Sequence, residues 1–469
     1  MSMDKETLLR VLSGLRDRPD ELIAISVRQA EQLAVQAEQI ARLEATVAGL
    51  ERRLSEWEQR PPGSVAPFRI EEGKRTQNPK RPGRPKGHVG CSRPRPEVTE
   101  DIRVALSACP CCGGALEGIE PVEQIIEELP VVRPRVIRLT TYKGRCPSCG
   151  PVRSSHPLGV STAVGAAGVA LGPQALSVIA RLQYQWHLSK RKSCQLLEQL
   201  FGLRVSPGGL VAATHRLAGR LKDDYSALWQ KARQSSTLYS DETGWYVGSP
   251  GYSLWVFTNE AFTLYRIVKS RNRSELYQTI GTDFGGVLVS DCLSVYDEAS
   301  RLQHKCYSHH FKAIKQAMAE HPQNGDGFLA QLCLCLKSAM ILKDLKDQTD
   351  PSSWRDSVEH LRQNTSALLK QPRGQPQEES VRLRLLKQHD HLFTFLDYDQ
   401  VEATNNQAER QLRPAVIARK LSCGNRTELG AATFEVLASL AATCRQTGQD
   451  LAGLILDALA PTTQLRSTR

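Results

Sequence analysis

Three acidic side chains stand out because of the stretches that contain them. Glu409 is the only acid in ATNNQAERQLRP (residues 403–414), where it lies among two asparagines and two arginines. Asp241 lies in TLYSDETGWYV, and Asp291 ends the apolar run GGVLVSD. Carboxylates that converge on one place bind divalent cations through oxygen. Two such cations can catalyse phosphoryl transfer, so the elements that carry these acids decide whether this chemistry is possible.

An ordinary structural role is the simpler interpretation of each acid taken alone. Asn406 could cap a helix and place Glu409 at its third position, which is a capping-box arrangement. Pro414 would then end or kink this helix near Arg413. An acid at the end of a strand is commonly a solvated turn residue.

The elements around Asp241 and Asp291 are predicted to be strands. The stretches TLYSDETGWYV, YSLWVFTN and AFTLYRIVK predict three consecutive antiparallel strands joined by short turns. A helix is expected around Ser274–Ile280, and GGVLVSD predicts a buried strand that ends at Asp291. Three such strands, a helix and a strand ending in an acid form the opening order of an RNase H-like fold.

Strand geometry allows the two aspartates to share a site. Side chains alternate between the faces of a strand, so only one of Asp241 and Glu242 can face that site. Adjacent strands are about 4.8 Å apart, so Asp241 and Asp291 can lie close together. A third acid from a later helix would complete the metal site, and Glu409 is a candidate.

Two C-x2-C pairs indicate a second kind of metal site, and their members are Cys109, Cys112, Cys146 and Cys149. Each pair is followed by glycine, and four thiolates at this spacing suit tetrahedral zinc. Cys111 could replace Cys112 as a ligand. The stretch between the pairs, residues 122–144, is predicted to form strands with a turn. A structural zinc ribbon is therefore predicted over residues 105–156.

The charge distribution favours a polyanionic partner for the first half of the chain. The 469 residues carry a net charge of +11, and residues 61–235 hold 26 Lys and Arg against 13 Asp and Glu. The sequence KRPGRPKGH (residues 80–88) resembles an AT-hook, an extended basic strand in a narrow minor groove. A solvated basic tether is the alternative, and either would attract phosphate. The basic side chains of this motif are Lys80, Arg81, Arg84 and Lys86.

The start of the chain predicts a coiled coil. Apolar residues recur every seven positions at Leu33, Ile40, Val47 and Leu54, which favours a homo-oligomer. The alternative is an amphipathic helix packed on its own chain. The sequence shows neither a signal peptide nor a stretch able to span a bilayer, which predicts a cytoplasmic protein without a membrane partner.

The motifs together resemble bacterial DDE transposases of the insertion sequence 66 family. The matching stretches occur in the family's order, from about residue 80 to residue 450, and are GRPKGH, CPCCGG, RCPSCG, SDETGWYV, VLVSDCLSVY, KCYSHH and TNNQAERQLRPAVIARK. Jointly they are highly specific. The region of the first strand is shorter and more aromatic than the usual family form.

The resemblance implies roles for the acids and their neighbours. Asp241, Asp291 and Glu409 would be the three catalytic acids and would bind Mg²⁺ or Mn²⁺. Arg410 and Arg413 would face DNA phosphates or the neighbouring acids. A C-x2-H element formed by Cys306 and His309 would support the site or the local structure. A second zinc at that element would need more ligands, such as Cys333 and Cys335.

The resemblance also implies a multidomain α+β protein with an RNase H-like catalytic core. The predicted segments are a coiled coil (1–60), a basic proline-rich linker (61–104), a zinc ribbon (105–156), a helical, helix-turn-helix-like DNA-binding region (157–235), the first part of the core (236–310), an all-α insertion (311–395), the second part of the core (396–430) and a C-terminal helical tail (431–469). The expected activity is cleavage and transfer of double-stranded DNA at element ends and target. Accessory proteins of the same element and association with the nucleoid are further expectations.

Two other classes of protein fit parts of the sequence. A DNA-binding regulator, or an inactive transposase relative, would use the same basic and zinc-binding segments without cutting DNA. A scaffolding protein would use the coiled coil but would explain neither the positive charge nor the acids. Metal-dependent nicking would distinguish an active transposase from these two classes. Salt-sensitive DNA binding would distinguish the regulator from the scaffold.

Overall fold

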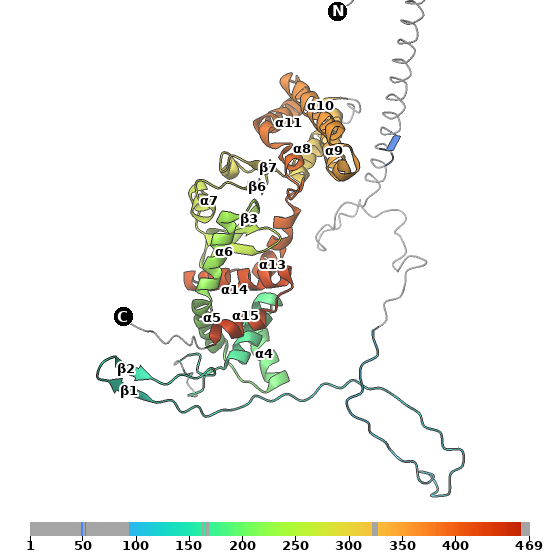
Figure 1. Ribbon diagram of the computed structural model, residues 1–469, viewed down its shortest axis with the longest axis vertical. Coiled ribbons are helices and arrows are strands. Elements are labelled where there is room, and N and C mark those ends of the chain that lie inside the picture. The colour runs from blue at the N-terminus through green and yellow to red at the C-terminus, as the bar shows by residue number, and fades with distance from the viewer. Residues whose placement is uncertain are drawn as a thin grey trace, which may run out of the picture. The chain divides into compact units, whose positions relative to one another are not determined.

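The computed structural model describes residues 48–49, 52, 93–161, 164, 168–320 and 327–460 (Figure 1). The chain forms two units, residues 1–129 and 130–469. The predicted coiled coil lies outside the described residues, apart from three helical positions at 48, 49 and 52. The basic motif with Lys80, Arg81, Arg84 and Lys86 also lies outside them.

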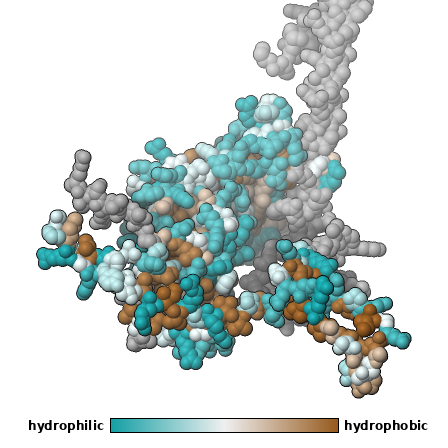
Figure 2. Space-filling model, turned by 60° about the horizontal axis from the view of Figure 1, so that its bottom comes forward, coloured by the Kyte–Doolittle hydropathy of each residue, from teal (hydrophilic) through white to brown (hydrophobic). Residues whose placement is uncertain are grey.

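Residues 93–142 contain neither a helix nor a strand. Apolar side chains along this stretch are exposed, Val122 to 94% and Val136 to 93%. Figure 2 shows apolar surface beside hydrophilic surface on the face that it draws. The prediction of strands over residues 122–144 is therefore wrong for all but the last two residues. A strand needs a neighbour for its backbone groups, and only the hairpin of β1 (Lys143–Cys146) and β2 (Gly150–Arg153) supplies one here.

Helices precede the large sheet, as predicted. They are α3 (Pro173–Ala180), a π-helical turn η2 (Arg181–Gln185), α4 (Lys190–Phe201), α5 (Pro207–Arg220) and α6 (Lys222–Gln234). The Oγ atom of Ser206 accepts a hydrogen bond from the Gly209 amide at 3.1 Å and caps α5, while Pro207 is its first residue. Gly202 ends α4 with φ of 68°, a left-handed conformation that favours glycine.

A five-stranded mixed sheet forms the centre of the second unit, in the order β5-β4-β3-β6-β7. Its strands are β3 (Thr237–Val247), β4 (Ser249–Thr258), β5 (Thr263–Val268), β6 (Val287–Ser290) and β7 (Gln303–Lys305). The first three are antiparallel neighbours, whereas β6 pairs parallel with β3 and β7 parallel with β6. Helix α7 (Arg273–Ile280) connects β5 to β6, and a short 3-10 turn, η3 (Ser294–Tyr296), follows β6. The predicted order of strands and helix is confirmed.

The outer edge of the sheet at β5 is covered by α14 (Glu428–Thr447), which α15 (Leu451–Leu459) follows. Three β5 amides donate to side chains of α14, in the pairs Thr263 with Thr443, Tyr265 with Ser439 and Ile267 with Glu435. Every second residue of a strand advances about 6.8 Å and every fourth residue of a helix about 6 Å, so the two series match. Residue 431 thus lies inside α14, a helix that packs on the sheet. The C-terminal helical tail that was expected to begin at residue 431 does not begin there.

Glu435 makes the stability of this edge depend on pH. Burial raises the pKa of the Glu435 carboxyl to about 7. The folded chain therefore holds this proton more tightly than the unfolded chain, in which glutamate titrates near pH 4.3. The stability that the protonated Glu435 contributes is fully present below about pH 4.3 and is lost as the pH rises through about 7.

Glu435→Gln is expected to stabilise the protein above pH 7 by roughly 1–3 kcal/mol, because glutamine keeps an acceptor for the Ile267 amide and carries no charge. At pH 5 the two proteins should differ little. Thermal unfolding at pH 5 and pH 8 measures the effect. Glu428→Gln, at an exposed position of the same helix, is the control without such a gain. An equal change at both pH values would contradict this account.

An all-α segment lies between β7 and α13 (Asn406–Ser422), as predicted (Figure 1). Its elements are α8 (Tyr307–Glu320), α9 (Phe328–Leu345), η4 (Lys346–Gln348), α10 (Pro351–Lys370), α11 (Pro376–Lys387), η5 (His389–His391) and α12 (Thr394–Asp397). The chain then returns to the sheet with α13 (Asn406–Ser422). Among the described residues, no helix combines the length and the apolar composition that crossing a membrane requires.

Candidate active site

Strands β3 and β6 place Asp241 and Asp291 side by side. Asp241 lies within β3, and Asp291 directly follows β6. These strands pair in parallel, with Tyr239 opposite Val289. Continued by two residues, this register places Asp291, just beyond the end of β6, opposite Asp241. The Oδ1 atom of each carboxylate accepts a local backbone hydrogen bond at 2.9 Å, which orients the side chain.

Helix α13 brings Glu409 to the same end of the sheet, but its start differs from the prediction. Asn406 is the first helical residue, and Asn405 takes the capping position without a side-chain capping bond. The capping-box interpretation of Glu409 is therefore wrong. Asn405 is fully buried, and its Nδ2 group donates to the Ser240 carbonyl oxygen at 2.8 Å. This bond ties the beginning of α13 to β3, next to Asp241.

The expectation that Pro414 would end or kink the helix near Arg413 is wrong about the end. Pro414 lies inside α13, which continues to Ser422. The helix packs against β3 and β4, and Arg419 from its last turn donates to the Thr243 hydroxyl at 3.1 Å. Packing of this kind offsets the loss of one backbone hydrogen bond at an internal proline.

The three acids influence one another electrostatically. Burial and the negative charges of Glu242, Asp291 and Glu409 together raise the pKa of the Asp241 carboxyl to about 7. The predicted acids from β3, β6 and α13 are thus close enough for their charges to interact. A bound cation would relieve this repulsion, and carboxylate oxygens are the ligands that Mg²⁺ and Mn²⁺ prefer. The donor set therefore fits such cations.

Glu242 points to the opposite face from Asp241, as strand alternation predicts. The Tyr296 hydroxyl donates to the Glu242 carboxylate at 2.8 Å and lies 3.2 Å from the Ser240 hydroxyl on the same face. Burial raises the pKa of the Glu242 carboxyl, and the charge of Asp291 also raises it. Sequence reasoning missed this interaction between Asp291 and Glu242. Strand alternation places Asp241 and Glu242 on opposite faces of the sheet, but it does not show that Asp291 is near enough to affect both.

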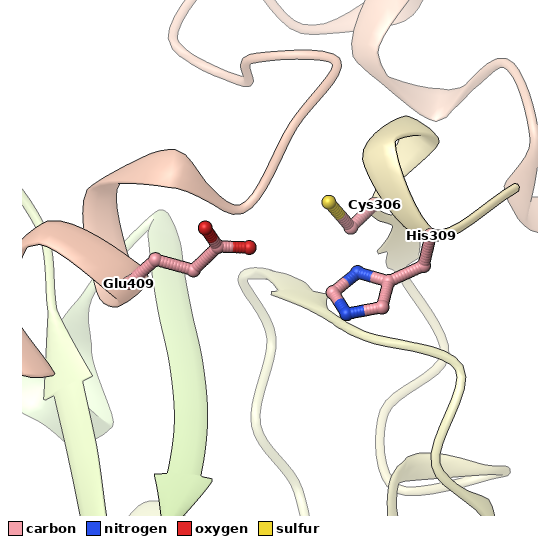
Figure 3. A group of neighbouring side chains, drawn as sticks. All are labelled: Cys306, His309 and Glu409. Carbon is pink, nitrogen blue, oxygen red and sulfur yellow. The ribbon is translucent and has the colours of Figure 1, made fainter. Parts of the chain in front are cut away.

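The C-x2-H element lies beside Glu409. Cys306 directly follows β7 and is fully buried, and His309 lies in the first turn of α8. The Cys306 sulfur accepts a hydrogen bond from the Asn405 amide at 3.1 Å. The potential ligand atoms of Cys306, His309 and Glu409 all lie within 4.8 Å of one another. Figure 3 shows the three side chains turned toward one another from α8 and α13.

A buried lysine behind Asp291 was missed by sequence reasoning. Lys305 is fully buried, and its Nζ atom donates to the Ser290 hydroxyl at 3.2 Å and lies 5.6 Å from the centre of the Tyr296 ring. Burial lowers the pKa of Lys305 to about 8. The sequence KCYSHH contains this lysine, but one charged residue in a three-residue strand gives no pattern that indicates burial.

The cysteine pairs belong to different units. The backbone amides of Cys111 and Cys112 lower the pKa of the Cys109 thiol. In the β1–β2 turn, the amides of Cys149 and Ser148 lower the pKa of the Cys146 thiol. The local backbone therefore favours the thiolate form of Cys109 and of Cys146, which is the form that zinc binds.

The predicted DNA-contacting residues on α13 are exposed. Arg410 and Arg413 both lie on the solvent-facing side of this helix. Arg410 directly follows Glu409, so its charge is carried on the same helical turn as the acid. This position leaves both guanidinium groups open to a polyanion.

Comparisons with known proteins cover most of the second unit. The family described as "Transposase IS66 family" matches residues 168–433, a range that includes the three acids, Cys306 and His309. The cysteine pairs and the basic linker lie outside that range. The uncharacterized protein y4jD of Sinorhizobium fredii (strain NBRC 101917 / NGR234) is 25% identical over 396 residues, which cover 75% of this chain and 74% of that protein.

Proposed function

The chain belongs to the IS66 family of transposases, and on this premise we propose that it is a DDE transposase that cleaves and joins DNA strands with divalent metal ions. The observation that carries the proposal is that Asp291, at the end of β6, and Glu409, on α13, lie close enough to Asp241 on β3 for their charges to raise its pKa. The strand order, with three antiparallel strands followed by two parallel ones, supports an RNase H-like core. Helices α8 to α12 would be an insertion into that core.

Asp241, Asp291 and Glu409 would hold Mg²⁺ or Mn²⁺. When bound, such cations would polarise the scissile phosphodiester and stabilise the leaving oxygen. Asp241 must lose its proton to serve as a ligand, and its raised pKa couples this step to pH near neutrality. Asn405 positions Glu409 by fixing the start of α13 on β3.

Several basic segments would bind DNA. Arg410 and Arg413 are exposed on α13 beside the acids and could contact the phosphates of the strand being cut. Helices α4 and α5, which a short turn joins, would be the helix-turn-helix-like pair. The basic motif at residues 80–88 and a zinc ribbon of the two cysteine pairs would add contacts to the element ends. Pairing of two ends would come from the coiled coil, with accessory proteins of the element as further partners.

Cleavage of DNA that carries the element's own ends tests the proposal. The full-length chain is expected to produce nicks with free 3′-hydroxyl groups in Mg²⁺ and to join them to a second DNA. Omission of the metal should stop both reactions and leave binding. Binding without nicking in Mg²⁺ or Mn²⁺ would instead support a DNA-binding regulator.

A further inference from the structure

Cys306, His309 and Glu409 bring a thiol, an imidazole and a carboxylate to one place. Two come from the junction of β7 and α8, and the third comes from α13 (Figure 3). All their potential ligand atoms lie within 4.8 Å of one another. We propose that these three side chains bind a zinc ion, at a site distinct from the cysteine pairs and joined to the acidic site through Glu409.

The state of His309 is the first argument for a bound cation. Its Nδ1 atom is buried and has no hydrogen-bond partner within the described residues. Figure 3 shows the ring with a nitrogen toward the thiol and the carboxylate. A buried polar atom without a partner costs roughly 1–3 kcal/mol, so such atoms are uncommon without a function. A metal ion between the three side chains would use this lone pair.

The surroundings of Cys306 are the second argument. The sulfur is fully buried, and the Asn405 amide points at it from 3.1 Å. Backbone amides of this kind stabilise and orient metal-bound thiolates from outside the ligand set. Burial raises the pKa of the free Cys306 thiol, whereas the amides at the start of α8, which Cys306 immediately precedes, act in the opposite direction and favour a negative sulfur. His309 is three residues later, a spacing that keeps both ligands on one side of the first turn.

The ligand types select the metal. Thiolate and imidazole ligands favour zinc, whereas Mg²⁺ prefers oxygen ligands alone. In a tetrahedral zinc site with bonds of about 2.0–2.3 Å, neighbouring ligand atoms are about 3.5 Å apart. Small side-chain rotations would bring the three atoms to that spacing. Three protein ligands would leave a fourth position open for water or for a DNA oxygen.

The position of Glu409 gives the site a consequence. A zinc ion on one side of its carboxylate would fix a side chain whose charge also acts on Asp241. The link from zinc to strand cleavage rests on the proposed function, whereas the zinc site itself does not.

Zinc content of the full-length protein tests the inference. Each variant is saturated with Zn²⁺, dialysed and analysed for zinc per chain. Cys306→Ser and His309→Ala are both expected to hold one zinc fewer than the wild type. Cys444→Ser, which changes a buried cysteine of α14, should match the wild type. Equal zinc contents in all four proteins would overturn the proposal.

Cobalt spectroscopy keeps the test decisive if Cys306→Ser fails to fold. In the chain in which Cys109, Cys112, Cys146 and Cys149 are all serine, one bound Co²⁺ should still show a thiolate-to-cobalt charge-transfer band. The band should disappear when His309→Ala is added. Its absence from the first protein, or its persistence in the second, would contradict the site.

The proposed function can fail separately. Asp241→Asn should lose DNA cleavage and keep its full zinc content. If zinc binds at Cys306 and the chain never cuts DNA, the result supports the zinc site and contradicts the proposed transposase activity.

Discussion

Asp241→Asn is expected to slow metal-dependent DNA cleavage on the order of a thousandfold while DNA binding persists. Asparagine keeps the shape of the side chain and an oxygen that can accept the hydrogen bond from the Glu242 amide. It removes the negative charge that a divalent cation needs at this position in β3. Loss of several kcal/mol of transition-state stabilisation corresponds to this change in rate. Single-turnover nicking and a DNA-binding titration on the same protein measure the two effects.

The control for this variant is Asp283→Asn, the same change at an exposed position before β6. It should cleave at the wild-type rate. The wild type should also bind Mg²⁺ more weakly as the pH falls below about 7, because protonation of Asp241 then competes with the cation. A cleaving Asp241→Asn protein would show that the first acid lies elsewhere.

Gly286→Ala is expected to destabilise the second unit by about 3 kcal/mol or more, because the backbone before β6 has no room for a side chain. An added Cβ atom would overlap the Ser235 carbonyl oxygen and lie 2.8 Å from that of Ser236. The Ser236 carbonyl oxygen accepts a hydrogen bond from the Val287 amide at 2.8 Å. This bond is at the start of the β3–β6 pairing. A shift here would therefore also move Asp291 away from Asp241.

The neighbouring glycine supplies a matched control. A Cβ atom at Gly285 would meet nothing within 4 Å, so Gly285→Ala should change stability little. Urea unfolding followed by tryptophan fluorescence compares the two variants, since Trp245 and Trp255 lie in β3 and β4. Equal midpoints for both alanine variants would show that β6 does not approach residues 235 and 236 as closely as described.

The strands and most helices around the site could be predicted because local patterns determine them. Alternating residues predicted β3, β4 and β5, and the helix predicted around Ser274–Ile280 is α7. The start of α13 could not be predicted in this way. Asn405 and Asn406 are equally good caps in sequence, and only the Ser240 carbonyl in β3 makes Asn405 the residue that is buried before the helix.

Contacts between distant segments explain the other differences. The match of Glu435, Ser439 and Thr443 to alternate amides of β5 exists only once the helix lies along that strand. Lys305 is buried, and its contacts are with Ser290 and Tyr296, which lie 15 and 9 residues earlier in the sequence. The apolar residues of 122–142 have high strand propensity, but a strand also needs a pairing partner, which they lack within the described residues.

DNA cleavage by Glu409→Gln most directly tests the claim that three acids form one catalytic site. The full-length wild type, Glu409→Gln and Glu402→Gln are compared on DNA carrying the element's ends in Mg²⁺, with nicking and binding measured together. Glu402 is exposed shortly before α13 and serves as the matched control. The account predicts that all three proteins bind DNA and that only Glu409→Gln fails to cut. Cleavage by Glu409→Gln at the wild-type rate would contradict it.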